Sequence, residues 1–233
     1  MIELATVLFI VALLIGGMLM PLSAQQDVRS RTDTDRLLAE ARDALLGYVM
    51  VNDRFPCPAT AASNGRDSPE GSGACSNPND GFLPAATLGL SSPLNDGYAY
   101  DGWNNVPAHR LRYSLSTVNA SALSTIGGLR NLGIAAVTGD LVVCRSGTGI
   151  TATACENPSP PLSANTLTDN AVAVIYSLGK NAPTGGTSTD EAPNLDGNRV
   201  FISAPASPNY DDALLWISPN ILVSRLVAAG RLP

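Results

Sequence analysis

The sequence predicts an α+β protein in which one long N-terminal helix packs against an antiparallel β-sheet. Helical spacing of apolar residues runs through the first part of the chain, up to residue 55. Short β-branched and aromatic runs, bounded by Gly, Pro, Asn and Asp, follow from residue 110 onward. The composition, 45% hydrophobic and 15% charged over 233 residues, is that of a chain that can form a core. We expect three regions: a hydrophobic half-helix over 1–24, an amphipathic half-helix over 25–55 and a globular head over 56–233.

The region 1–24 holds an apolar run, Leu4–Leu22, that starts directly after a carboxylate, Glu3. About 20 apolar residues are enough for a helix to span a bilayer. A secretory signal peptide would begin with basic residues and end in a small-residue cleavage site, and this segment matches neither well. A plain membrane anchor fits the length, but it gives the carboxylate no partner although a charge in hydrocarbon is costly. The run therefore predicts a transmembrane helix in which Glu3 has a further role.

The region 25–55 continues the helix in amphipathic form. Its apolar residues recur at i, i+3, i+4 and i+7, with Asp, Glu and Arg on the opposite side. Pro21 is expected to kink the helix near the junction, because proline lacks an N–H and clashes with the preceding turn. Pro56 is expected to end it. The stripe predicted to pack on the globular part is Leu37, Leu38, Ala41, Ala44, Leu45, Tyr48 and Val49.

The segment "IELATVLFIVALLIGG" resembles the N-terminal segment of type IV pilins and type II secretion pseudopilins. In that family a prepilin peptidase removes a short leader, and the new amino terminus is methylated. The resemblance implies that Glu3 pairs with the N-terminal ammonium of a neighbouring subunit, so Glu3 and Met1 are predicted assembly residues. More residues precede the glutamate in the family than the two present here. We therefore expect the sequence to begin slightly inside the mature chain.

The resemblance also makes the middle of the apolar half a predicted weak point of the helix. Gly16, Gly17 and Pro21 lower helix stability there. We expect this stretch to melt in an assembled filament, which would let subunits slide past one another as the filament stretches.

Two stretches of the region 56–233 extend the resemblance. The stretch "RFPCPATAASNGRDSPEGSGACSNPNDGFLPAATLGL" is similar to a Cys/Pro loop in a branch of bacterial pilin-like proteins. The stretch "DGWNNVPAHRLRYSLS" is similar to the turn that leads into the first sheet strand of pilins and pseudopilins. In an exported domain, four cysteines predict two disulfides, and a zinc site lacks a CxxC motif. Three pairings are possible, of which we expect the sequence-local one: Cys57 with Cys75 and Cys144 with Cys155.

The predicted sheet and its neighbouring helices follow from the same region. A closing helix is predicted with Ser218 as its N-cap, Pro219 at the first position and Gly230 at its end. A second short helix is expected within 116–133. The predicted strands are 110–116, 141–144, 170–179, 199–204 and 213–218.

An acidic set lies in two loops that bracket the strand expected at 199–204. Oxygen ligands from loops suit Ca²⁺, and some major pseudopilins hold calcium in a similar late loop. The alternative is a solvated acidic turn, with Asp196 and Gly197 making a tight turn. The possible calcium ligands are Asp190, Glu191, Asn194, Asp196, Asp211 and Asp212.

Composition and motifs narrow the function classes. The net charge of −6 and the scattered Lys and Arg residues argue against nucleic-acid binding. Neither a GxSxG motif nor a strand–GxGxxG–helix pattern is present, and the single histidine, His109, lies in a predicted loop, so we expect no enzyme and no catalytic residues. Apart from the possible calcium, no cofactor is expected.

The resemblance implies a structural subunit that polymerises with identical copies into an extracellular type IV pilus-like filament. Its partners would be the inner membrane before assembly, the prepilin peptidase and the pilus assembly machinery. One alternative is a pseudopilin of a type II secretion system, located in a periplasmic pseudopilus. A second, of another class, is a membrane-anchored periplasmic binding domain.

Overall fold

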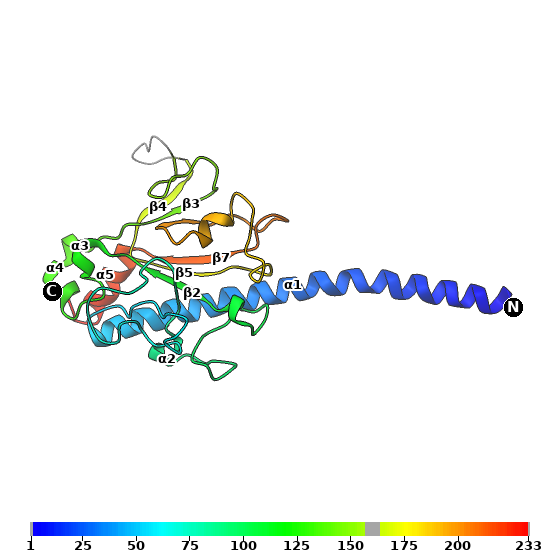
Figure 1. Cartoon of the computed structure of the whole chain (residues 1–233), viewed down its shortest axis with the longest axis horizontal. Helices are drawn as coiled ribbons and strands as arrows, with labels where there is room; N and C mark the ends of the chain where they lie inside the picture. Colours follow the sequence, from blue (N-terminus) through cyan, green and yellow to red (C-terminus); the bar gives the residue numbers. More distant parts are fainter. Residues whose placement is uncertain (1, 157–163, 233) are drawn as a thin grey trace.

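The computed structural model has a long helix that projects from a globular head (Figure 1). The structure describes residues 2–156 and 164–232, and it leaves out the side chains of residue 2 and residues 13–22. The head packs against the C-terminal half of the helix and leaves one side of it exposed, and the N-terminus lies at the far end of the projecting half (Figure 1). The fold is α+β with an antiparallel sheet and two disulfides.

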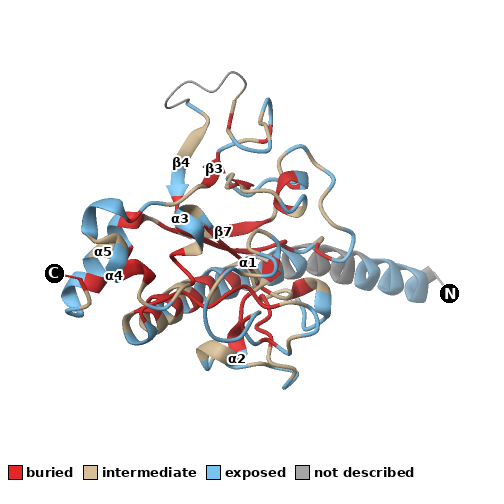
Figure 2. Cartoon of the chain, turned by 60° about the vertical axis from the view of Figure 1, so that its left-hand side comes forward, coloured by how far each residue is buried: buried red, intermediate tan, exposed pale blue. Residues whose placement is uncertain are grey.

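The helix α1 (Ile2–Asn52) buries one stripe of its second half in the head. Leu38 and Leu45 are almost completely buried there, and Thr34 closes the stripe on its N-terminal side. In Figure 2 the ribbon of this half is coloured as buried along one side, and the ribbon near the N-terminal end is coloured as exposed. The predicted amphipathic half is therefore confirmed, with Asn52 as its last helical residue. The fully buried members of the stripe are Leu38, Ala41, Leu45, Leu46 and Val49.

The first half of α1 carries large apolar side chains into solvent. Leu4 is 70% exposed and Phe9 is 67% exposed. Within the fully described side chains, no helix has a long enough apolar stretch to cross a membrane. The predicted transmembrane segment, Leu4–Leu22, includes residues 13–22, whose side chains the structure does not describe. The predicted weak point at Gly16, Gly17 and Pro21 falls in the same stretch and stays a prediction.

A four-stranded antiparallel sheet covers the buried face of α1. Its order is β1 (Gly81–Phe82), β2 (Arg112–Leu115), β5 (Ala173–Ser177) and β7 (Ala213–Ile217). The central strand β5 is buried at every residue, because it has a strand on each side, α1 on one face and further apolar residues on the other. The helix contacts β5 and β7, so the sheet fixes the position of α1 in the head.

A three-stranded sheet forms a second layer, in the order β4 (Thr166–Ala171), β3 (Leu141–Cys144) and β6 (Val200–Ile202). β3 pairs antiparallel with β4 but parallel with β6, which the prediction of an antiparallel sheet did not include. The predicted strand 170–179 is in fact two strands. The chain passes from one sheet to the other at Val172, whose N–H and C=O bond to Ile217 and Ser116.

Short helices close the ends of the sheets. The predicted closing helix is α5 (Pro219–Ala228), and the Ser218 side chain accepts a hydrogen bond from the N–H of Ile221. The second helical stretch is two short helices separated by the turns of residues 122–127, and Asn119 and Ala120 have left-handed backbone angles within the first helix. The remaining short elements are α2 (Ala85–Leu88), α3 (Val118–Ser121), α4 (Gly128–Leu132), η1 (Pro107–His109), η2 (Ile134–Ala136) and η3 (Ala192–Leu195).

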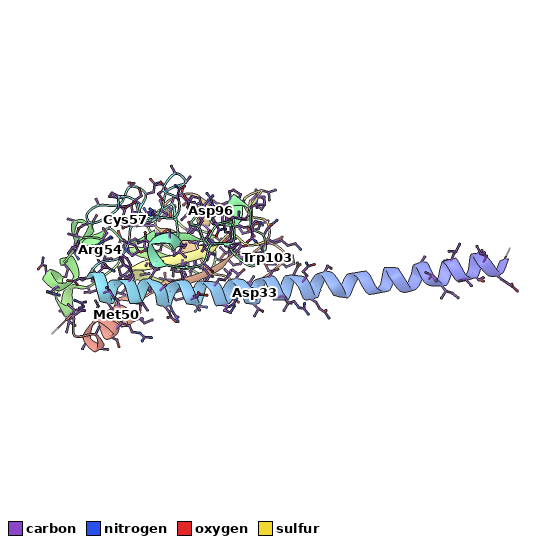
Figure 3. The ribbon with its side chains drawn as sticks, turned by 90° about the horizontal axis from the view of Figure 1, so that it is seen from below. Asp33, Met50, Arg54, Cys57, Asp96 and Trp103 are labelled. Atoms are coloured by element: carbon purple, nitrogen blue, oxygen red, sulfur yellow. A yellow bond between two sulfur atoms is a disulfide. The ribbon has the colours of Figure 1, made fainter. Side chains whose placement is uncertain are left out.

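The loop that leaves the C-terminal end of α1 is held by a buried ion pair and a disulfide. Figure 3 labels Arg54 and Cys57 in this loop. Arg54 donates to the Asp67 carboxylate over 2.9 Å and to the Tyr48 hydroxyl over 2.7 Å. Both predicted disulfides are confirmed: Cys57 pairs with Cys75 and Cys144 pairs with Cys155.

Replacing Arg54 by Ala should lower the free energy of unfolding by about 3–5 kcal/mol, because it leaves the Asp67 carboxylate buried without its cation. Both side chains of this pair are only 6% exposed. The matched control is Arg66→Ala, since Arg66 is 64% exposed and lies 3.9 Å from Glu70. We expect the control to change stability by less than about 0.5 kcal/mol. Urea unfolding measures both variants, and equal losses would contradict the assigned role of the buried pair.

Candidate functional site

Three carboxylates meet in the head at the junction of two loops. Glu191 lies at the start of η3, and Asp211 and Asp212 directly precede β7. One oxygen from each lies within 4.8 Å of the others. Glu191 is 4% exposed and Asp212 is 2% exposed, so two of the three are taken almost fully out of water. We call Glu191, Asp211 and Asp212 the acidic triad.

Neighbouring amides orient the acidic triad. Asn194 donates to Asp212 Oδ2 over 2.7 Å and accepts from the N–H of Ile202 over 2.8 Å, so it ties the triad to β6. Asn181 donates from Nδ2 to Glu191 Oε1 over 3.1 Å. The backbone N–H of Asp211 donates to the same Glu191 oxygen over 3.2 Å.

Gly179 permits the close approach of Asp211. Its φ of +67° is a conformation that side chains other than glycine's adopt with strain. A Cβ atom at this position would lie 1.9 Å from Asp211 Oδ1. The chain therefore needs a glycine at the end of β5 to bring this carboxylate against the backbone.

Burial and the neighbouring carboxylates raise the pKa of the two aspartates of the triad. Burial raises the pKa of Asp212 to about 7, and the charges of Glu191 and Asp211 add to this effect. Burial, followed by the charge of Glu191, also raises the pKa of Asp211. Arg31 of α1 donates to the backbone carbonyls of Asp211 and Asp212 over 3.4 Å, and it partly offsets the repulsion. Among the described residues no Lys, Arg or His forms a salt bridge with the triad.

The donor set fits a hard divalent cation. Asp211 Oδ1 and Asn181 Oδ1 are buried and have no hydrogen-bond partner in the described part of the chain. A polar cavity of about 610 Å³ opens beside them and is lined in part by Asn181 and Glu191. Ca²⁺ is coordinated by six to eight oxygens, which carboxylates, amide oxygens and water can supply. Glu191, Asp211, Asp212 and the amide oxygen of Asn181 are the residues that could hold it.

The sequence-based ligand set is only partly brought together. Glu191, Asp211 and Asp212 converge, and Asn194 supports them through a hydrogen bond. Asp190 instead accepts hydrogen bonds from Ser146 Oγ and the N–H of Gly147. It therefore holds the loop after β3.

Asp196 is exposed and accepts hydrogen bonds from Asn198. It therefore lies in a solvated tight turn, which was the alternative to a calcium ligand at this position. Sequence reasoning missed Asn181, which lies ten residues before Glu191 in a Gly- and Thr-rich loop and carries no spacing signal.

A second buried polar cluster contains a serine, an aspartate and the single histidine. Ser177 donates to Asp101 Oδ2 over 2.6 Å, and His109 Nδ1 lies 3.2 Å from the same carboxylate. The serine thus bonds to the carboxylate and not to the imidazole that would activate a nucleophile. The cluster holds the loop of residues 101–109 on β5. The Trp103 side chain of this loop is half-buried, and its ring lies 5.9 Å from Lys180 Nζ, beside α1.

Of the two predicted assembly residues, the structure describes Glu3, at the far end of α1. Glu3 is in the first turn of the helix and its side chain is exposed. Met1 lies outside the described residues. Glu3 is therefore far from the acidic triad, and the two sites are separate.

The acidic triad should make the head less stable as the pH rises. An unfolded aspartate has a pKa near 3.9, and the pKa of Asp212 in the fold is about 7. The folded chain therefore binds more protons between about pH 4 and 7, and its stability falls over this range, by at most about 4 kcal/mol. Asp212→Asn should reduce this slope, while Asp196→Asn should keep it. Urea unfolding across this pH range measures the slope, and a slope unchanged in Asp212→Asn would contradict the assignment.

Calcium should stabilise the head through the acidic triad. At a calcium concentration about 100-fold above the dissociation constant, the gain in stability is about 2.7 kcal/mol. We expect Asp211→Asn to lose this gain and Asp196→Asn to retain it. Thermal unfolding at about pH 8, with calcium and with a chelator, gives the comparison. No response in the wild type, or an equal response in Asp211→Asn, would show that the triad does not hold calcium.

Comparison of the chain with protein-family models, curated proteins and solved structures finds no match.

Proposed function

We propose that this protein is a structural subunit that polymerises with identical copies into a type IV pilus-like filament. The observation that carries the proposal is the set of exposed apolar side chains between residues 4 and 11 of α1. Leu4, Leu8 and Phe9 are each more than 60% exposed on a helix that projects from the head (Figure 1). Large apolar patches on soluble proteins mark surfaces that other molecules cover.

Self-association would bury these side chains in a bundle of N-terminal helices, with the heads outside. Burial contributes about 1.5–3 kcal/mol for each large apolar side chain, so this term would dominate assembly. The fold supports the same arrangement. The second half of α1 is fixed on the sheet, so the head cannot turn back to cover the apolar first half of the same helix. Glu3 would be the assembly residue, since a charge buried at the start of an apolar helix needs a partner. The inner membrane would hold the subunit before assembly.

Deleting residues 1–26 should give a soluble monomer, because the head keeps its disulfides, its sheet and the buried stripe of α1. The full chain should sediment as large assemblies and appear as filaments in electron micrographs. A deletion variant that still forms filaments would overturn the proposal. A full chain that stays monomeric in membranes would favour an anchored binding domain instead.

Glu3→Ala should reach the membrane in wild-type amounts and yet form few filaments. The substitution removes the carboxylate, so the positive group of the neighbouring subunit that pairs with Glu3 is left buried without a partner. Glu3→Asp, which keeps the charge, is the matched control and should retain part of the yield. The measurement is filament yield relative to the membrane-bound subunit. Wild-type yield from Glu3→Ala would mean that apolar packing alone sets the register.

A further inference from the structure

A groove runs between α1 and α5 on the surface of the head. It has a volume of about 510 Å³. One wall comes from α1 and the other from the exposed side of α5, whose opposite side packs in the core through Leu222 and Leu226. The lining residues are Arg42, Asp43, Leu46, Asn220, Ile221, Ser224 and Arg225.

The groove combines an apolar surface with excess positive charge. Each wall carries one arginine and one aliphatic residue four positions apart, which places them on the same side of their helix. Arg42 lies 3.4 Å from Asp43, so its charge is partly neutralised. Arg225 is exposed and forms no ion pair with any residue that the structure describes. Ile221, 41% exposed, supplies the apolar surface beside it.

The N-terminal end of α1 has the complementary composition. Glu3 is exposed and forms no ion pair within the described residues. Val7 and Ile10 follow it at i+4 and i+7, so they lie on the same face of the helix. Val7 is 58% exposed and Ile10 is 56% exposed. This face presents one carboxylate followed by aliphatic side chains, and the groove presents an unpaired arginine beside an aliphatic side chain.

The two surfaces cannot meet within one chain. Glu3 and Arg42 belong to the same continuous helix and are 39 residues apart. At about 1.5 Å per residue the helix holds them roughly 60 Å apart. The groove can therefore receive an N-terminal segment only from another copy of the chain. Because the two surfaces differ, the contact is heterologous, and a heterologous contact whose rotation does not close into a ring repeats into an open-ended chain of subunits.

We propose that the groove between α1 and α5 receives the N-terminal segment of α1 from a second copy, with its Glu3 carboxylate against Arg225. This contact rests on the proposed function, a subunit that polymerises into a filament. It sets the position of neighbouring subunits along the filament axis. Neighbouring subunits in this contact are displaced by roughly 60 Å along the helix axis, the spacing of the two surfaces on one chain. The partner of Glu3 is then a guanidinium, which stays charged at any physiological pH.

Charge exchange tests the contact. Glu3→Arg and Arg225→Glu should each reduce filament yield at least tenfold, because like charges would then face each other. The double variant restores an opposite pair and should recover most of the yield. Arg66→Glu is the matched control, since Arg66 is also exposed but lies away from the groove, and it should assemble as the wild type does. Thermal unfolding of the variants separates loss of assembly from loss of the fold.

The outcomes distinguish this contact from the filament itself. Wild-type filaments together with a normally assembling Arg225→Glu variant would overturn the contact and leave the proposed function standing. A double variant that stays defective while both single variants fold would also overturn it. A wild-type chain that never assembles would overturn the proposed function.

Disulfide trapping gives a direct test of the same contact. All four native cysteines are paired, so introduced cysteines report only on their own contacts. A Val7→Cys chain mixed with a Ser224→Cys chain should give a mixed disulfide dimer after oxidation. Val7→Cys mixed with Ser63→Cys, on the loop after Cys57, should give much less. Equal trapping in the two mixtures would contradict a specific groove contact.

Discussion

The packing of one stripe of α1 on the central strands β5 and β7 is the contact on which the rest of the architecture depends. It buries Leu38, Leu45 and Val49 in the main core and holds the helix in a fixed direction. A helix is stiff along its axis, so fixing its second half also fixes where its first half points. The exposed apolar segment, the position of Glu3 and the groove beside α5 all take their places from this single packed face.

The head around this contact uses polar groups to hold its loops. The Arg54–Asp67 pair fixes the segment that leaves α1, and the cluster of Asp101, His109 and Ser177 fixes the next loop on β5. The acidic triad differs from both, because three carboxylates face one another without a salt-bridging cation among the described residues. It is therefore a source of instability above about pH 7. A bound divalent cation would turn this repulsion into coordination.

Assembly and cation binding use different residues of the molecule. The proposed groove contact links Glu3 to α5 of another copy, and it uses none of the residues of the acidic triad or of the cavity lined by Asn181 and Glu191. The two can thus be perturbed independently. In the proposed filament, the same heterologous contact repeats from subunit to subunit, so its spacing along α1 would set the stagger of the heads.

The sequence by itself determined the elements whose periodicity is local. These are the two-part character of α1, the capped helix after Ser218 and most strands. The sequence also favoured the sequence-local pairing of the four cysteines, which the structure has. Only the tertiary structure decided the contacts between distant segments. It divided the run 170–179 between two sheets, paired β3 with β6 in parallel, and chose Glu191, Asp211 and Asp212 from a longer acidic set. Local spacing carries no information on such contacts, because the loops that bring them together have no period and are placed by the packing of the sheets.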